Sequence, residues 1–161
     1  MYRIGLDINE SSIKACQIES RMNENKLVDY FIIESESKLN FLSFNEDDIQ
    51  KTTNLLRKKV VEKQLLGIPC NISITDKSVF IKVLEFPSMS DAELKKAIKL
   101  ETENISPIPL SKASTSAKVI KSKDNSKVVK VLVVIAPKDL INNLLNIVKN
   151  AGLNVKSLEP S

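Results

Sequence analysis

Near the N-terminus the chain reads Gly5-Leu6-Asp7-Ile8-Asn9-Glu10-Ser11-Ser12-Ile13-Lys14. An apolar strand carries one acidic residue into a short polar turn, and a second strand leaves the turn with a lysine near its start. Folds that hold the phosphates of ATP between two domains use such a hairpin, because hydroxyls and backbone N–H groups can face an anion while the aspartate positions a metal-bound water. The alternative is an ordinary β-hairpin with a solvated turn. The candidate phosphate-binding residues are Asp7, Asn9, Ser11, Ser12 and Lys14.

Composition predicts a soluble globular protein. The chain has 161 residues, a length that is enough for one domain or for two small ones that share a core. Of these residues 42% are apolar and 27% are charged, as in soluble globular proteins. No apolar run approaches the ~18 residues that cross a bilayer, and the N-terminus enters a strand at once, without the apolar segment of a signal peptide. We therefore expect a cytoplasmic protein with no transmembrane segment of its own. Cys16 and Cys70 lie in apolar strand patterns and are expected to be small buried side chains rather than a disulfide.

Several function classes are excluded by residues that the sequence lacks. There is no histidine, which removes histidine-based triads and histidine-ligated metals, and two lone cysteines do not make a zinc site. Residues 78–161 hold 13 basic and 8 acidic side chains, but none of the basic ones is arginine, and aromatics are 4% of the chain. Nucleic-acid binding usually adds aromatics or a dense arginine patch. We expect no nucleic-acid partner, no metal site and no catalytic residue; the lysines form a solvated face, or attract an anionic membrane surface weakly.

The first half of the chain predicts three strands, a helix and a fourth strand. Asn45 is a suitable N-cap for the helix, followed by acidic residues in the first turn. This order of elements is the opening of the ribonuclease-H-like unit of actin-type ATPases, which indicates an α/β fold. The predicted elements are strands at 2–8, 12–19, 26–33 and 70–75 and a helix at about 45–66.

The second half predicts a β-α-β-β-α-β unit over residues 78–156. Ser90 and Glu93 form a capping box that begins its first helix. Residues 128–135 are nearly all apolar, so that strand is expected to be central and covered on both faces. The predicted elements are strands at 78–86, 113–121, 127–136 and 153–158 and helices at about 91–104 and 138–151.

Three blocks of the chain share the order and residue types of a known family. They are the hairpin at 5–14, the strand and helix at 79–94 with the following Ala97, Ile98, Glu101 and Ile105-Ser106-Pro107-Ile108-Pro109, and the segment 131–138 with Ala151-Gly152-Leu153. Together they resemble the PilM family, the actin-like cytoplasmic proteins of type IV pilus assembly, which are related to the cell-division protein FtsA.

The resemblance implies an architecture and a role. Residues 1–77 would be part of the actin-like subdomain 1A, residues 78–156 the inserted subdomain 1C, and residues 157–161 a truncated return to 1A, with subdomains 2A and 2B absent. In the family, the cleft between 1A and 1C receives the cytoplasmic N-terminal peptide of the membrane protein PilN; which residues here would contact it is not assigned. The resemblance thus implies a cytoplasmic scaffold, peripheral to the inner membrane, that binds a PilN-like partner and other pilus or secretion assembly proteins.

The intact family also binds ATP and Mg between subdomains 1A and 2A, and this chain departs from that pattern. Asn9 replaces the usual glycine; it tolerates a left-handed backbone, but its side chain would crowd a phosphate, and Glu10 adds negative charge. The Gly-rich second phosphate motif is absent, so we expect neither tight ATP binding nor hydrolysis. The alternative is a fragment of an actin-like ATPase or sugar kinase, with Asp7 and Lys14 as its residual half-site; a ribonuclease-H-type nuclease would need further converging carboxylates. Whether the chain is a fragment or a natural short protein stays open.

Overall fold

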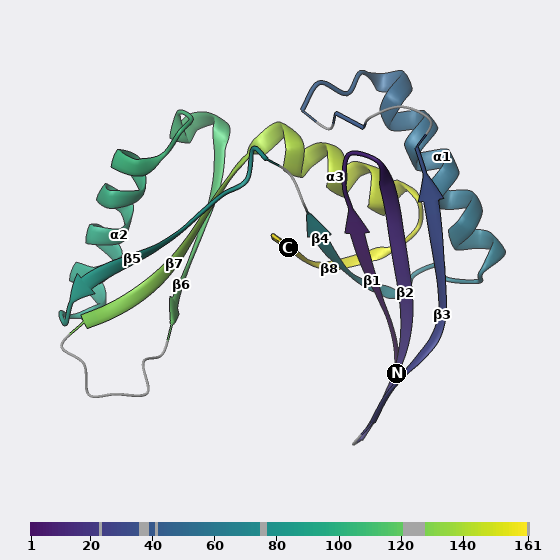
Figure 1. The fold of residues 1–161 in the computed structure, drawn as a ribbon, viewed down its shortest axis with the longest axis horizontal. Coiled ribbons are helices and arrows are strands. Elements are labelled where there is room, and N and C mark those ends of the chain that lie inside the picture. Colours follow the sequence, from purple (N-terminus) through teal and green to yellow (C-terminus); the bar gives the residue numbers. More distant parts are fainter. Residues whose placement is uncertain (23, 36–38, 41, 75–76, 121–127, 161) are drawn as a thin grey trace. The chain divides into compact units, whose positions relative to one another are not determined.

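The computed structural model describes residues 1–22, 24–35, 39–40, 42–74, 77–120 and 128–160. The chain divides into two compact units (Figure 1), of which unit 1 comprises Met1–Asp76 with Asp139–Ser161 and unit 2 comprises Lys77–Lys138. This division differs from the predicted boundary at residue 156. The last helix and the last strand join unit 1, because the strand pairs with the sheet of that unit.

Unit 1 is built on a five-stranded sheet in the order β3-β2-β1-β4-β8. Strands β1, β2 and β3 form an antiparallel meander, whereas β4 runs parallel to β1 and β8 runs parallel to β4. The predicted strands of the first half are therefore confirmed, although the predicted end at Thr75 lies outside the described residues. The strands are β1 (Tyr2–Ile8), β2 (Ser12–Arg21), β3 (Glu24–Glu34), β4 (Pro69–Ile74) and β8 (Asn154–Pro160).

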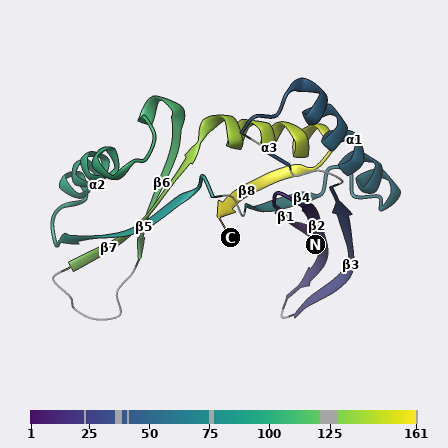
Figure 2. The same ribbon diagram turned by 45° about the horizontal axis from the view of Figure 1, so that its top comes forward.

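Two helices, α1 (Glu46–Glu62) and α3 (Lys138–Asn150), cover one face of this sheet (Figure 2). Because strand side chains alternate between faces, every second residue of β1, from Ile4 to Ile8, is buried under the helices, and the residues between them occupy the opposite, open face. Leu144 of α3 is fully buried as well. The open face is the one that carries Asp7.

Helix α1 begins as predicted and ends earlier. The Asn45 side chain accepts a hydrogen bond from the Asp48 N–H at 2.9 Å, and the Asp48 carboxylate accepts one from the Asn45 backbone N–H at 3.4 Å, which completes a capping box. The helix ends at Glu62 rather than near residue 66, because Gln64 adopts a φ of 57°, in the left-handed region that stops a helix.

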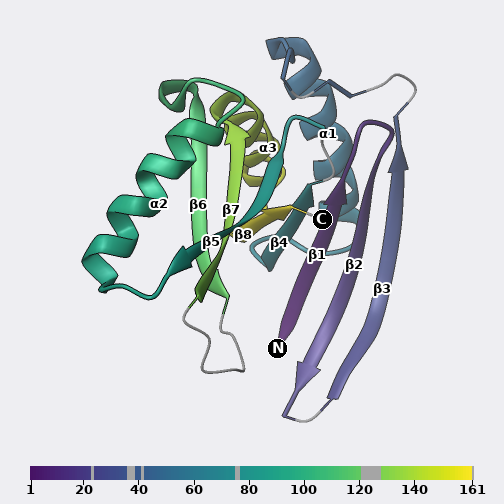
Figure 3. The same cartoon turned by 60° about the vertical axis from the view of Figure 1, so that its left-hand side comes forward.

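Unit 2 is a three-stranded antiparallel sheet, in the order β5-β7-β6, with helix α2 packed on it (Figure 3). Buried side chains of β7, including Val131 and Val133, form its core with Leu94 of α2. β7 is central, as predicted, but within unit 2 only one of its faces is covered; Leu132 and Val134 on the other face are half-buried. The elements are β5 (Phe80–Pro87), α2 (Asp91–Ile105), a short 3-10 helix (Leu110–Lys112), β6 (Ala113–Ile120) and β7 (Val128–Pro137); the predicted strand ends at 121 and 127 lie outside the described residues.

The predicted capping box of α2 is confirmed. The Glu93 carboxylate accepts hydrogen bonds from the Ser90 hydroxyl at 2.6 Å and from the Ser90 N–H at 3.0 Å. These bonds stabilise the ionised carboxylate, so the Ser90 hydroxyl and, secondarily, its N–H lower the pKa of Glu93. Unit 2 is thus a β-α-β-β unit, shorter by one helix and one strand than the predicted insert.

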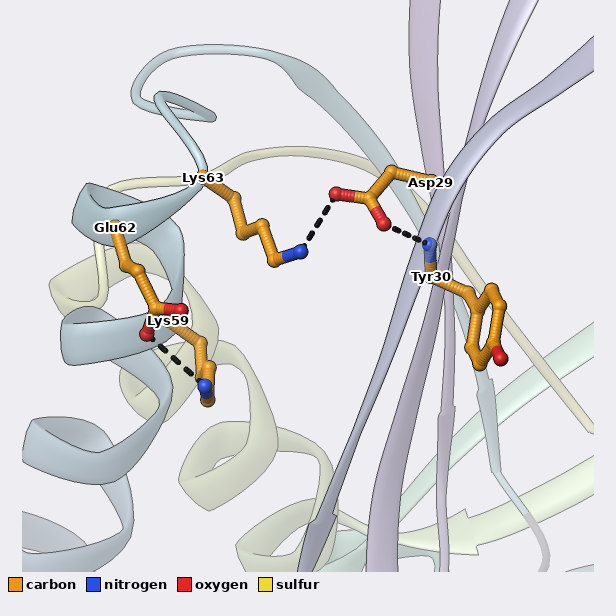
Figure 4. Close-up of polar contacts among 5 residues, drawn as sticks. All are labelled: Asp29, Tyr30, Lys59, Glu62 and Lys63. Atoms are coloured by element: carbon orange, nitrogen blue, oxygen red, sulfur yellow. Dashed lines mark hydrogen bonds and ion pairs between the residues drawn. The ribbon is translucent and has the colours of Figure 1, made fainter.

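The edge strand β3 is tied to the end of α1 by one ion pair (Figure 4). Lys63, the C-cap of α1, donates to the Asp29 carboxylate at 2.8 Å, and the Tyr30 N–H donates to the same carboxylate at 2.7 Å. The hydrogen bond from Lys63, followed by that from Tyr30, lowers the pKa of Asp29, and the same contact with Asp29 raises the pKa of Lys63. The pair places a charged contact at the edge of the sheet.

Candidate functional site

Four side chains form a row across the open face of the unit 1 sheet. Strand register sets Lys14 beside Asp7, Asp7 beside Ser73, and Ser73 beside Glu159. Side chains that are direct neighbours across paired strands project from the same face. The sequence therefore brings Asp7 and Lys14 together, as the hairpin predicts, and the fold adds Ser73 and Glu159. We call these four residues the polar row.

A hollow of about 430 Å³ lies over the polar row. Gly5, which is lined up with Cys16 on the neighbouring strand, contributes to its floor. A Cβ atom on Gly5 would lie 3.2 Å from the Cys16 Sγ atom, so the glycine keeps this part of the hollow open. Of the ion pairs in the described part of the chain, none includes Asp7, Lys14 or Glu159. Their charged groups thus remain available to water or to a small polar ligand.

The turn of the hairpin is closed on itself. The Asn9 Oδ1 atom accepts hydrogen bonds from the Ser11 N–H at 3.0 Å and the Ser12 N–H at 3.0 Å, and from both hydroxyls at 2.9 Å and 3.3 Å respectively. The Asn9 N–H in turn donates to the Ser12 carbonyl oxygen at 3.1 Å. An asparagine side chain that bonds its own following backbone in this way stabilises a turn without a ligand.

This turn does not fit a phosphate. The N–H groups and hydroxyls that would face an anion already donate to Asn9 Oδ1. Asn9 does not use the left-handed backbone that asparagine tolerates, since in the described ranges Gln64 is the one residue other than glycine with a positive φ. The five predicted phosphate residues therefore separate: Asp7 and Lys14 line the hollow, whereas Asn9, Ser11 and Ser12 form the closed turn.

Sequence reasoning missed three polar residues that line the hollow, Asn71, Ser73 and Glu159. A signal for two of them exists in β4, where Asn71 and Ser73 alternate with buried apolar residues and so must share the open face. No local signal identifies Glu159, because its place depends on the pairing of β8 with β4 across the intervening unit 2.

The two cysteines differ in environment. Cys70 is buried, as predicted, and burial, with a smaller contribution from the charge of a Cys16 thiolate, raises the pKa of Cys70 to about 12. Cys16 is half-buried and lies at the hollow. Both are free thiols. In the described ranges, no three cysteine or acidic side chains gather as metal ligands.

The topology defines the class of protein. An antiparallel meander, followed through a helix by parallel strands, makes unit 1 a partial actin-like α/β domain, and unit 2 is inserted between β4 and α3. The family model described as type IV pilus assembly protein PilM matches residues 5–159, and the chain belongs to this family. The resemblance carried by the three sequence blocks is thus confirmed.

Solved structures support the same fold. The chain is similar to a structure titled PilM-PilN type IV pilus biogenesis complex, with a TM-score of 0.81 and 17% identity over 98% of this chain and 47% of that one. It is also similar to the cytoplasmic domain of EpsL, an inner membrane component of the type II secretion system of Vibrio cholerae, with a TM-score of 0.66 and 10% identity over 99% of this chain and 57% of that one. The chain thus spans about half the length of these relatives. No curated protein matches the sequence.

Proposed function

We propose that this chain is a cytoplasmic scaffold component of the inner-membrane assembly platform of a type IV pilus, or of a related secretion or competence system, and that it binds the cytoplasmic N-terminal peptide of a PilN-like membrane protein. The observation that carries the proposal is the family match over residues 5–159. One of the similar structures, matched over 98% of this chain, comes from a complex titled PilM-PilN. Other assembly proteins of the platform are further proposed partners.

An exposed apolar surface supports a binding role. Ile81 and Val83 of β5 are 46% and 47% exposed on the face of the unit 2 sheet that α2 leaves uncovered, beside the half-buried Leu132 and Val134. Adjacent exposed apolar side chains on a sheet face mark surfaces that bind other molecules. Helices within the described ranges do not combine the length and apolar character that crossing a bilayer requires. In this proposal the PilN-like partner is the membrane protein.

A binding role accounts for the hairpin better than a catalytic one. Asn9 Oδ1 already accepts the hydrogen bonds that a phosphate would need, so the residual ATPase or kinase half-site at Asp7 and Lys14 lacks its phosphate-facing donors. The proposal therefore includes no ATP hydrolysis by this chain and no tightly bound nucleotide. ATP and Mg remain ligands of the intact family by resemblance alone.

The test is a calorimetric titration of the folded chain with a synthetic peptide that copies the cytoplasmic N-terminus of the PilN-like protein from the same organism. Saturable one-to-one binding is expected, with no binding of a scrambled peptide. Val83→Lys should weaken binding about tenfold if the open face of the sheet contributes. Leu100→Lys, at a 62% exposed position on α2, is the matched control and should leave the affinity unchanged. Absence of binding by a chain shown to be folded by circular dichroism would refute the proposal. Saturable binding of Mg-ATP in the same cell would instead favour the ATPase or kinase half-site.

A further inference from the structure

Strand β6 forms an unpaired edge of the unit 2 sheet. It pairs with β7 on one side, and in the described part of the chain no other backbone group hydrogen-bonds to residues 114–120. All seven of these residues are exposed. Alternate residues of an edge strand direct N–H and C=O groups away from the sheet, which makes the edge a template for a further strand.

The other edges carry register shifts or a proline that discourage pairing, whereas β6 carries neither and has one exposed charged residue, Lys118. The two edge strands of unit 1 are β3 and β8. A register shift interrupts the pairing of β3 with β2, and another interrupts the pairing of β8 with β4. Bulges and charged contacts such as Asp29–Lys63 are known means of protecting an edge. β5 ends in Pro87, which cannot donate a backbone hydrogen bond. β6 pairs in continuous register over all eight of its residues.

Residues of β6 and helix α2 line a groove of about 400 Å³; Figure 3 shows these two elements of unit 2. Its helical wall is a stripe at positions i, i+3, i+4 and i+7, formed by Lys95, Ile98, Lys99 and Thr102, and β6 contributes Thr115 and Ala117. The helix that forms this wall is held on the sheet because its Leu94 is buried in the core of the unit, and within the helix Thr102 Oγ1 donates to the Ile98 carbonyl oxygen at 2.6 Å. The groove thus combines a free backbone edge with a partly apolar side.

The charge of the groove selects its occupant. Its two ionisable side chains, Lys95 and Lys99, are both exposed lysines, and no acidic side chain lines it. Of the ion pairs in the described residues, none includes either lysine. Unit 2 as a whole, residues 77–138, contains 12 lysines and six acidic residues. Such a surface attracts acidic ligands and repels basic ones.

We propose that an extended, acidic segment of a partner protein adds to β6 as a fourth strand of the unit 2 sheet. Its backbone pairs with the free edge of β6, and alternate side chains project toward α2, where acidic ones lie beside Lys95 and Lys99 and an aliphatic one covers Ile98. Strand addition derives affinity from the backbone bonds and specificity from every second side chain. This site lies on the side of the sheet that faces α2, whereas the surface proposed above for the PilN-like peptide is the open face with Ile81 and Val83, and the inference does not depend on that proposal.

The probe is the peptide TETVTET-NH2 with a fluorescent label on its N-terminal amine; its alternate side chains are Glu, Val and Glu. Saturable binding in fluorescence anisotropy is expected, weakening as salt rises, with no binding of the basic counterpart TKTVTKT-NH2 labelled in the same way. Lys99→Glu should weaken binding about tenfold or more, because a like charge then faces the acidic peptide. Lys96→Glu makes the same charge change at an exposed position of α2 outside the groove and should alter affinity less than about twofold.

Hydrogen exchange then tests the strand pairing itself. The bound peptide should slow exchange of amides in residues 114–120, whereas a peptide N-methylated at alternate residues should fail to bind. Equal binding of the acidic and basic peptides, equal effects of the two lysine variants, or unchanged exchange in β6 would each overturn the proposal. The PilN-like peptide should bind the Lys99→Glu variant as it binds the unchanged chain, so failure of one proposal is distinguishable from failure of the other.

Discussion

The Oδ1 atom of Asn9 lies 3.0 Å from the backbone nitrogen of Ser12 and accepts its hydrogen bond. The same atom accepts from the N–H and the hydroxyl of Ser11. In a phosphate-binding hairpin these donors would face the ligand, so the asparagine side chain takes the place that a phosphate oxygen would need. The side chain of Asn9 thereby stabilises the turn of the hairpin without a bound ligand.

Replacing Asn9 by glycine should release these donors. Asn9→Gly is expected to lower the free energy of unfolding by about 1 kcal/mol, as for the loss of a comparable side-chain cap and the gain of a flexible residue. It should also raise the affinity for inorganic phosphate, measured by NMR titration of the amides in the turn. Asn9→Asp is the control, because it keeps the acceptor and adds negative charge; stronger phosphate binding by this variant would contradict the explanation.

Local patterns predicted much of this fold because their partners lie close in the chain. The hairpin around Asp7 and the capping box of Ser90 and Glu93 depend on residues within one turn or one strand pair. The position of α3 and β8 was not predictable in this way. Their apolar residues can cover either sheet. The parallel pairing of β8 with β4 joins two strands that are separated in the sequence by the whole of unit 2. For the same reason the sequence pointed to Asp7 but not to Glu159 in the polar row.

Gly152 and Gly67 provide a matched pair of backbone tests. Both have positive φ values, 99° and 73°, but a Cβ on Gly152 would lie 2.5 Å from the Leu66 Cδ2 atom, whereas one on Gly67 would meet nothing within 4 Å. Gly67→Ala should cost about 1 kcal/mol, the strain of a left-handed alanine. Gly152→Ala should cost more, because the Leu66 side chain must also move. Urea unfolding of both variants measures the difference; an equal or smaller loss at Gly152 would contradict the argument.

The thiols should differ in reactivity. Because the pKa of Cys70 is raised to about 12, its thiolate fraction at pH 8 is about one part in 10⁴, and burial blocks access as well. Alkylation by iodoacetamide, followed by mass spectrometry, should modify the half-buried Cys16 first and Cys70 only as the chain unfolds. In Cys16→Ser the labelling rate of Cys70 should increase steeply with added urea; rapid labelling of Cys70 in the native protein would contradict its burial.

The ion pair between Asp29 and Lys63 predicts how stability depends on pH. The pKa of Asp29 is lowered in the folded state, so its contribution is fully present above the unfolded value of about 3.9 and is lost as pH falls through the folded pKa. The pKa of Lys63 is raised, so its contribution is fully present below about 10.4 and is lost as pH rises through the folded pKa. Asp29→Asn should therefore lower Tm most between about pH 5 and pH 9, and the difference should vanish in strong acid.

A second ion pair, within α1, serves as a control that distinguishes the restraint of β3 by the Asp29–Lys63 pair from a general effect of charge on stability. Lys59 donates to Glu62 at 2.9 Å within α1, and that contact lowers the pKa of Glu62. Glu62→Gln should thus flatten the acid limb of the stability curve as Asp29→Asn does. It should leave hydrogen exchange in β3 unchanged, because both partners belong to one helix, whereas Asp29→Asn should speed exchange at the β3 edge that Lys63 holds. Equal exchange in the two variants would mean that the pair between β3 and α1 does not restrain the edge strand.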